Sequence, residues 1–416
     1  MAKFGRAIRG EWLIEEDIRF LNHGSYGAAP KVVLDAQSRW RRRMERQPVR
    51  FMTDELPAHL RAAAAGLAAY LGAEGDDLVF VDNATTAVNA VLRSLAFAPG
   101  DEIVTTTHAY NAVRNAIKYV CDRTGAVFKE AAIPFPATGD DAEVIAAVEA
   151  GITPRTRLAV IDHVGSETAL VLPIARLIQL LKHSGVPVLV DGAHAPGMIP
   201  LALNDLGADW YVGNGHKWLC APKGCAFLWA RPERQAEIHP TVISRGLGQG
   251  FTAEFDWQGT RDFSPWLAVT DALAFRRGLG DGVARYCQGL VRDAAEHLAA
   301  AWKTEIGTPE RMQGFMITLR LPAGVEPTVE AAKALRQCLL ANHRLETKIF
   351  PLAGALWLRL SAFVYNEFED YSPLAELLAR PERLLGDRPP PSESRLAYSA
   401  EAAASAAKAG RPTEGR

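Results

Sequence analysis

The chain has 416 residues, of which 48% are hydrophobic and 23% charged, a composition typical of a soluble globular protein with about two domains. Its net charge of −2 gives no electrostatic reason to expect binding to nucleic acid or to an anionic membrane. No apolar run approaches the roughly 20 residues that span a bilayer, and the N-terminus lacks the apolar core of a secretory signal. The five cysteines are scattered without zinc-ligand spacing, so we expect a cytoplasmic protein with reduced thiols and no metal.

The N-terminal region is predicted to be a loop followed by helices. Residues 21–30, LNHGSYGAAP, are rich in glycine and small side chains and favour a loop. From Pro30 to about Leu71 the pattern is rich in alanine and arginine and predicts two helices, which Pro48 interrupts.

The first predicted strand of the large domain leads into a possible anion site. Leu78–Val81 is a short apolar strand, and the polar turn DNATT follows it directly. Apolar residues then recur with helical spacing from Val88 to Leu95. The free N–H groups at a helix start attract anions, and the hydroxyls of Thr85 and Thr86 add donors. An ordinary threonine cap is the simpler explanation of this motif taken alone.

Two more predicted strands end in polar segments. Ile103–Thr106 leads to THAYN, which contains His108 and Tyr110 and precedes a helix. Leu158–Asp162 leads to HVGSET, and a helix with one apolar face then returns to the next strand. This order predicts a strand–helix–strand crossover and therefore a parallel sheet.

The central segment carries the residues around which the rest is organised. Val186–Val190 is a continuous apolar run typical of a parallel strand buried on both faces, and it stops at Asp191, in the crevice where open α/β sheets bind ligands. Lys217 follows in GNGHKW, between strand-like Asp209–Val212 and Gly224–Trp229. A lysine that can hold an aldehyde as a Schiff base and an acid that can keep a pyridine nitrogen protonated suit pyridoxal phosphate. Either residue alone is more simply a surface lysine or a strand-terminating aspartate.

Two histidines lie beside these residues in the sequence. His194 follows Asp191 closely and is a candidate to hydrogen-bond the cofactor or the substrate, whereas His216 precedes Lys217 and is a candidate to bind the phosphate. Lone histidines are more often structural, but these two flank the same candidate site. The glycine-rich GLGQG at residues 246–250 does not have the GxGxxG spacing of a dinucleotide site.

A second, smaller α+β unit is predicted after Gly307. Its expected strands and helix are Met316–Leu321, Val329–Asn342, Thr347–Phe350 and Leu356–Leu360. Arg359 lies in RLS on the last strand, where a rigidly presented guanidinium can pair bidentately with a carboxylate, although a surface arginine is the plainer alternative. From Pro389 onward, large apolar residues are scarce and a disordered tail is predicted.

DGAH followed by HKW resembles the cofactor segment of the aminotransferase class V family of pyridoxal phosphate enzymes. LNHGSYGAAP, HAYNAVRN, HVGSETALVLPI and GNGHKWLCAPKG look like the isopenicillin N epimerase-like branch, and the resemblance covers about residues 21–377. It implies fold type I, with a mostly parallel seven-stranded sheet in a large domain and a small C-terminal α+β domain. The expected boundaries are an arm over the active site at 1–30, the large domain at 31–306, the small domain at 307–388 and the tail at 389–416.

The resemblance also implies roles for the candidate residues. Lys217 would be the base, Asp191 the partner of the pyridine nitrogen, and Tyr110 the ring stacked on the cofactor, with His108 as the alternative ring. The other cofactor-binding residues would be Ala84, Thr85, Thr86, Ser166, His194 and His216. The substrate-binding residues would be Asn22, His23 and Arg359. A homodimer is implied, in which Gly259-Thr260 reaches the neighbouring active site. Ser166 stands where desulfurases carry an asparagine, a departure from the family pattern.

The expected chemistry takes place at Cα and Cβ of an α-amino acid. Arg359 would orient the substrate carboxylate, and Lys217 would remove the Cα proton. Reprotonation from the opposite face gives epimerisation, loss of a β-substituent gives lyase chemistry, and proton delivery to the cofactor gives transamination. Epimerisation needs a second acid, for which Tyr110, His108 and His23 are candidates.

We favour an isopenicillin N epimerase-like activity. The alternatives are a C–S lyase of a sulfur-containing amino acid, related to cysteine desulfurases or to enzymes of ergothioneine synthesis, and an aminotransferase. A desulfurase that carries a persulfide is disfavoured because residues 343–358 contain no cysteine. A non-catalytic binding module is a more distant alternative, and the intact Lys217, Asp191 and Arg359 argue against it.

Overall fold

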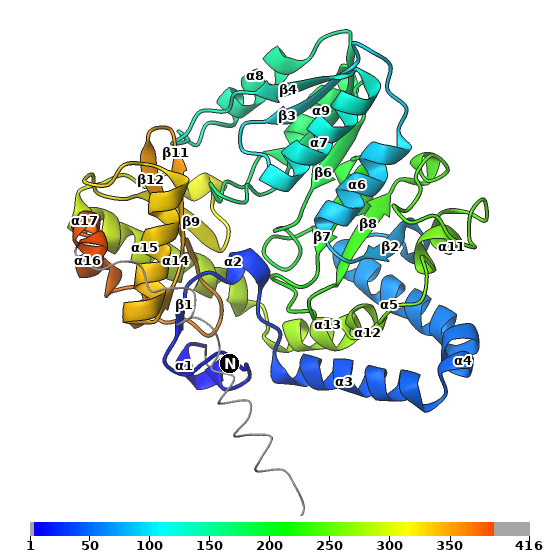
Figure 1. Ribbon diagram of the computed structural model, residues 1–416, viewed down its shortest axis with the longest axis horizontal. Coiled ribbons are helices and arrows are strands. Elements are labelled where there is room, and N and C mark those ends of the chain that lie inside the picture. The colour runs from blue at the N-terminus through cyan, green and yellow to red at the C-terminus, as the bar shows by residue number, and fades with distance from the viewer. Residues whose placement is uncertain (1–3, 387–416) are drawn as a thin grey trace, which may run out of the picture.

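The computed structural model describes residues 4–386, so the predicted tail at residues 389–416 lies outside the described part of the chain. Figure 1 shows a large α/β unit beside a smaller unit, with the N-terminal segment, in dark blue, running between them. No helix within residues 4–386 is long and apolar enough to cross a membrane.

The large unit is built on a seven-stranded sheet. In spatial order its strands are β2 (Leu78–Val81), β8 (Ala226–Ala230), β7 (Trp210–Asn214), β6 (Val188–Asp191), β5 (Thr156–Asp162), β3 (Glu102–Thr106) and β4 (Val127–Ala131). β8 runs antiparallel to both neighbours and all other pairs are parallel, which confirms the predicted mostly parallel sheet of fold type I. Edge strand β4 was not predicted, because its mostly solvent-accessible sequence VFKEA lacks a continuous apolar run.

Helices cover both faces of this sheet, which explains why its inner strands are continuous apolar runs. Successive side chains of β2 pack into two different hydrophobic clusters. Val79 packs with α6 and α7, and Phe80 packs with α5 and α9. These helices are α5 (Leu56–Leu71), α6 (Ala84–Ser94), α7 (Asn111–Thr124) and α9 (Ile174–His183). Further short or peripheral helices of this unit include α8 (Asp141–Gly151), α10 (Leu203–Leu206), α11 (Phe251–Asp256), α12 (Ser264–Leu267) and α13 (Val269–Gly278).

The predicted break at Pro48 lies between two long helices. α3 (Lys31–Arg46) ends before it, and Pro48 occupies the first position of the short helix α4 (Pro48–Arg50), where its missing N–H costs nothing. The side chain of Gln47 accepts a hydrogen bond from the Arg50 N–H at 3.2 Å. A π-helical turn (Phe51–Glu55) then leads into α5.

The small unit contains a three-stranded antiparallel sheet in the order β11-β12-β9. The strands are β9 (Met316–Arg320), β11 (Lys348–Leu352) and β12 (Ala355–Ser361), and the helices are α14 (Gly282–Trp302), α15 (Val329–His343), α16 (Leu374–Leu377) and α17 (Pro381–Leu385). The long helix α14 packs against β9 through its apolar face. We therefore propose that the small unit begins with α14, earlier than the boundary at residue 307 predicted from the sequence.

The N-terminal arm joins the small unit before it crosses to the large one. After α1 (Arg6–Arg9), strand β1 (Arg19–Phe20) pairs in parallel with β10 (Leu345–Glu346), and the short helix α2 (His23–Tyr26) follows. The Ser361 N–H then donates to the Leu21 carbonyl at 2.9 Å. This last hydrogen bond anchors the arm to β12, the strand that carries Arg359.

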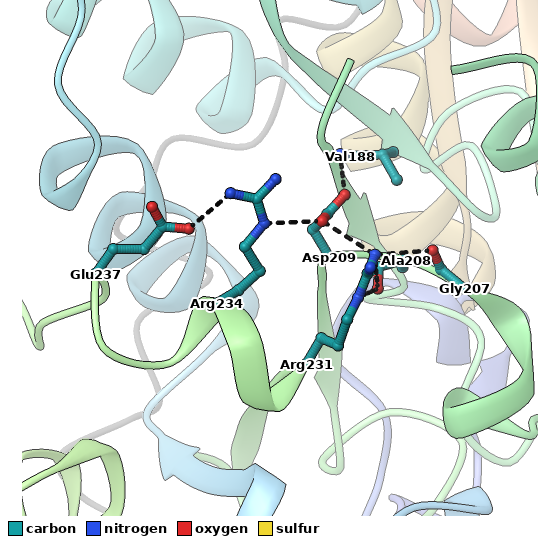
Figure 2. Close-up of polar contacts among 7 residues, drawn as sticks. All are labelled: Val188, Gly207, Ala208, Asp209, Arg231, Arg234 and Glu237. Atoms are coloured by element: carbon teal, nitrogen blue, oxygen red, sulfur yellow. Dashed lines mark hydrogen bonds and ion pairs between the residues drawn. The ribbon is translucent and has the colours of Figure 1, made fainter. Parts of the chain in front are cut away.

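A buried aspartate ties the sheet together at its end remote from the carboxyl ends of β6 and β7 (Figure 2). Asp209, 4% exposed, accepts the backbone N–H of Val188 at 2.8 Å, where β6 begins. It also accepts hydrogen bonds from Arg231 and Arg234, both at 3.0 Å, just beyond β8. Asp209 therefore links the start of β6, the start of β7 and the segment that follows β8.

Candidate active site

A cavity of about 490 Å³ lies at the carboxyl ends of three neighbouring strands, where the large unit meets the small one. Asp162, Asp191 and Asn214, the last residues of β5, β6 and β7, line it from the large unit. Lys348 of β11 and Arg359 of β12 line it from the small unit. This is the crevice in which open α/β sheets bind their ligands.

Asp191 and Lys217 line this one cavity, as the sequence interpretation requires. Lys217 is 8% exposed, and its Nζ lies 2.9 Å from His194 Nε2. Burial, followed by repulsion from Arg359, lowers the pKa of Lys217 to about 7. Near neutral pH a large share of Lys217 is therefore the uncharged amine, the form that attacks an aldehyde.

Asp162 is a second buried carboxyl that the sequence argument did not single out. It stands in register with Asp191 on the neighbouring parallel strand, and its Oδ2 has no hydrogen-bond partner in the described chain. Burial, and then repulsion from Asp191, raises the pKa of Asp162 well above its ordinary value. Burial also raises the pKa of Asp191, but the Ala193 N–H and Lys217 favour its charged form. The sequence contained a signal for Asp162, because Asp162 ends a continuous apolar strand just as Asp191 does.

The N-terminus of α6 faces the cavity. Asn83, Ala84 and Thr85 line the cavity, whereas the N–H of Thr86 is already taken by the side chain of Asn83 at 2.8 Å. The side chain of Asn214 accepts the Ala84 N–H at 2.9 Å. The predicted phosphate contacts at 84 and 85 therefore lie at the cavity, while Thr86 belongs to the helix cap. Asn214 was missed, since nothing in the local sequence connects the end of β7 with α6.

The structure places Tyr110, but not His108, at the cavity. Tyr110 is the N-cap residue of α7 and lines the cavity with its side chain partly exposed. His108 is buried, with its ring nitrogens 3.0 Å from the Thr168 hydroxyl and 3.0 Å from the Ile133 carbonyl. Both polar atoms of His108 are thus used within the protein, and this geometry favours Tyr110 as the ring that faces a ligand.

Arg359 is held in place by the N-terminal arm and the loop after β5. Its Nη2 donates to Asn22 Oδ1 at 2.9 Å and to Ser25 Oγ at 3.1 Å, and its Nη1 donates to the Ser166 carbonyl. Burial lowers the pKa of Arg359 to about 10, which leaves it charged at neutral pH. Asn22 does not line the cavity and positions Arg359 instead. Ser25, missed from the sequence, lines the cavity itself.

The arm closes over the lysine segment, with Ser25 and Tyr26 facing the cavity. Gly27 has φ +66°, and a Cβ there would lie 2.1 Å from the His216 carbonyl oxygen. Only glycine therefore permits this approach of the arm to the backbone around Lys217. The glycine-rich composition of residues 21–30 reflects this close contact.

Like Asn22 and Thr86, two further predicted site residues do not line the cavity. His23 is fully buried, with Nδ1 2.7 Å from the Tyr365 hydroxyl and Nε2 3.1 Å from the Lys217 carbonyl. It therefore supports the backbone of Lys217 and is not placed to contact a substrate or to protonate one. Thr260 is exposed and does not line the cavity, so its predicted contact with a neighbouring subunit stays a prediction.

Both histidines beside the central residues line the cavity in uncharged form. Burial and the charge of Lys217 lower the pKa of His194 well below its ordinary value, and its Nδ1 has no partner in the described chain. Burial lowers the pKa of His216 to about 4, and its Nδ1 lies 3.3 Å from the Cys225 carbonyl. A neutral His194 can accept a hydrogen bond from Lys217 without repelling it.

These residues fit pyridoxal phosphate. The α6 turn suits its phosphate, Asp191 its pyridine nitrogen, and Lys217 its aldehyde. Asp162 Oδ2 and His194 Nδ1 are buried at this cavity without protein partners, which is uncommon unless a polar ligand binds nearby. Within residues 4–386, no group of three His, Cys, Asp or Glu side chains is arranged to hold a metal.

Sequence comparison finds relatives along most of the chain. Residues 21–325 match the family described as Aminotransferase class-V. The chain is 34% identical over 397 residues to the probable L-cysteine desulfhydrase, chloroplastic, of Arabidopsis thaliana, covering 88% of this chain and 83% of that protein. It is also 34% identical over 390 residues to the isopenicillin N epimerase of Streptomyces clavuligerus, covering 89% of this chain and 96% of the relative.

Solved structures show the same fold. The apo cysteine desulfurase of Thermococcus onnurineus NA1 superposes with a TM-score of 0.75 at 19% identity, covering 93% of this chain and 99% of that one. The cystine C–S lyase C-DES, in complex with cysteine persulfide, superposes with a TM-score of 0.73 at 22% identity, covering 88% of this chain and 98% of that one.

Proposed function

The chain belongs to the aminotransferase class V family of pyridoxal phosphate enzymes, and from this premise we propose that it is an amino-acid epimerase that acts through Lys217 and Tyr110. One observation carries the proposal. Lys217 follows β7 and Tyr110 follows β3, so they enter the cavity from opposite sides of the carboxyl pair on β5 and β6. Epimerisation needs proton-transferring groups on two sides of the substrate Cα.

Each residue has a separate role in the proposed reaction. Arg359 binds the substrate carboxylate through the N–H groups that the protein leaves free, and Asn22 and Ser25 hold the guanidinium for this contact. Bound pyridoxal phosphate supplies an electron-accepting ring that stabilises negative charge at Cα. Lys217, with its lowered pKa, takes the Cα proton. Burial raises the pKa of Tyr110, so its phenol stays protonated at neutral pH and can return a proton from the other side.

A second candidate function is C–S lyase chemistry. Relatives named L-cysteine desulfhydrase support it, and so does the cavity, because none of the residues that line it in the described chain is a cysteine. Sulfur would then leave directly, without transfer to the enzyme. This candidate needs Lys217 but no second acid. Aminotransfer, in which the proton goes to the cofactor carbon, is the third outcome.

An incubation in heavy water separates these outcomes. We expect the holoenzyme to place deuterium at Cα of an amino acid and to form the opposite enantiomer, with no keto acid. Release of pyruvate together with sulfide or a thiol would establish the lyase, and a keto acid from the intact carbon skeleton would establish the aminotransferase. An enzyme that binds pyridoxal phosphate but exchanges no Cα proton with any amino acid would refute all three and favour the non-catalytic module.

We also propose a cytoplasmic homodimer. The five cysteines are all unpaired, which suits a reducing compartment. Val242, Ile243 and Leu247 are large apolar side chains exposed on the segment between β8 and α11. Sedimentation of wild type and of Val242→Asp tests the dimer, and a monomeric wild-type enzyme with full activity would refute it.

A further inference from the structure

Two charged side chains beside Arg359 have no part in the proposed reaction. Lys348 on β11 and Glu167 in the loop after β5 both line the cavity. Their ion pair spans 3.7 Å from Nζ to Oε1, longer than a hydrogen bond. Their side chains are 36% and 52% exposed, and neither makes a side-chain hydrogen bond to any residue within 4–386.

The position of this pair relative to Arg359 is set by the fold. Lys348 and Arg359 are directly paired across the antiparallel strands β11 and β12, so their side chains lie on the same face about 5 Å apart at Cβ. Glu167 follows Ser166, whose carbonyl accepts a hydrogen bond from Arg359. The Glu167–Lys348 pair therefore lies next to the group that binds the substrate carboxylate.

A structural role explains this pair poorly. A loose ion pair that reaches solvent stabilises a fold little. Burial lowers the pKa of Lys348, so placing a charge there is unfavourable, and Glu167 only partly offsets this. Arg359 differs, because three protein groups hold its guanidinium in one orientation. The Lys348 ammonium and the Glu167 carboxylate keep most of their hydrogen-bonding capacity free toward the cavity.

We propose that Glu167 and Lys348 recognise the far end of the substrate side chain, and that the substrate is an α-amino acid whose side chain ends in a second ammonium and carboxylate group. This inference rests on the proposed function, because Arg359 must hold the first carboxylate. The second carboxylate binds Lys348 and the second ammonium binds Glu167. Two close charge-assisted hydrogen bonds then replace one loose pair.

The pair also discriminates between side chains. A side chain ending in a carboxylate alone is attracted by Lys348 but repelled by Glu167, and one ending in an ammonium alone meets the reverse. A substrate side chain with an uncharged end leaves the Glu167–Lys348 ion pair intact and gains no binding free energy from it. Only an end with both charges uses both residues.

Four probes that share the same Cα, Cβ and sulfur test this. They are L-cystine, S-carboxymethyl-L-cysteine, S-(2-aminoethyl)-L-cysteine and S-ethyl-L-cysteine, whose ends carry both charges, a negative charge, a positive charge and none. Dissociation constants come from the cofactor absorbance of the holoenzyme, and Cα deuterium exchange provides a second readout. We expect wild type to bind L-cystine at least about tenfold more tightly than the other three.

Single substitutions should switch this preference. Lys348→Gln leaves Glu167 alone and should make the aminoethyl probe the tightest of the four, whereas Glu167→Gln should favour the carboxymethyl probe. Affinity for S-ethyl-L-cysteine should stay unchanged in both, which also shows that the site is intact. The matched controls are Arg320→Gln and Glu305→Gln, which break an exposed ion pair of 3.1 Å away from the cavity and should alter no preference.

Equal affinity of wild type for all four probes would overturn the inference, and so would a uniform loss of binding in both variants. If no amino acid at all changed the cofactor spectrum or exchanged its Cα proton, the proposed function itself would fail. The two failures are therefore distinguishable.

Discussion

Asp162 and Asp191 stand in register at the ends of two neighbouring parallel strands, so that two buried carboxyl groups line one cavity. Two carboxylates this close repel each other, and ionising both away from water is costly in free energy. The Ala193 N–H, which donates to Asp191 Oδ1 at 2.9 Å, and the charge of Lys217 favour ionisation of Asp191. Asp162 lacks a partner for Oδ2 and is the better candidate to keep its proton.

Replacing Asp162 by asparagine should stabilise the apoprotein increasingly as pH rises. The pKa of Asp162 is raised in the folded state above its unfolded value of about 4. At pH values between these two pKa values, the folded state binds more protons than the unfolded state. The free energy of unfolding of wild type therefore falls as pH increases through this range. Thermal unfolding of both apoproteins should give similar midpoints near pH 4 and a higher midpoint for Asp162→Asn at neutral pH. A difference that does not depend on pH would contradict the assignment.

Covalent attachment of pyridoxal phosphate to the apoprotein should speed up as pH rises through about 7. The pKa of Lys217 is lowered to about 7, and its neutral amine is the nucleophile. Arg359→Gln removes a nearby positive charge, so the midpoint of this rate profile should move to higher pH. Stopped-flow absorbance gives the rate, and borohydride reduction with peptide mass analysis locates the label. An unchanged midpoint in Arg359→Gln would show that Arg359 does not contribute to the lowered pKa of Lys217.

Tyr110→Phe should separate epimerase from lyase chemistry. The substitution keeps the aromatic ring but removes the phenolic proton. If Tyr110 protonates the substrate, formation of the opposite enantiomer should fall by roughly 100-fold while Cα deuterium exchange through Lys217 persists. Chiral chromatography and proton NMR measure the two rates. Equal rates of enantiomer formation in wild type and variant would remove Tyr110 from the mechanism.

Asn22→Ala should weaken substrate binding without changing the chemical step. Asn22 Oδ1 accepts a hydrogen bond from Arg359 at 2.9 Å but does not reach the cavity. Loss of a buried hydrogen bond to a charged group costs about 1.5–3 kcal/mol, part of which should appear as a rise of about tenfold in KM with kcat nearly unchanged. A comparable fall in kcat with constant KM would indicate that Asn22 acts on the reaction itself.

Asp209→Ala should destabilise the protein strongly although it lies far from the cavity. The buried Val188 N–H would lose its acceptor, and the partly exposed Arg231 and Arg234 would lose their ion-pair partner, which together costs about 1–3 kcal/mol. Urea unfolding of the holoenzyme measures this. The matched control is Glu237→Gln, which removes the more exposed partner of Arg234 and should cost less than about 1 kcal/mol. Similar losses in both variants would contradict a special role for Asp209.

Strand prediction succeeded where both faces of a strand are buried. Leu78–Val81 was predicted with its observed bounds, and the strands that end at Asp162 and Asp191 were placed to within a few residues, because continuous apolar runs occur only where helices cover both faces. Edge strand β4 has no such run and was not predicted. The boundary between α12 and α13 lies at Ala268, which has nearly helical dihedral angles and gives no clear sequence signal.

The sequence by itself determined the sheet class, the position of Asp191 at a strand end, and the resemblance that pairs it with Lys217. Tertiary structure alone decided which polar residues share the cavity. Ser25 and Lys348 reach it from a short helix and a strand that are distant in sequence from Lys217, and His23 turns away to support the lysine backbone. The reason is physical: periodicity records which face of an element is buried, whereas contacts between the ends of separate elements depend on how those elements pack.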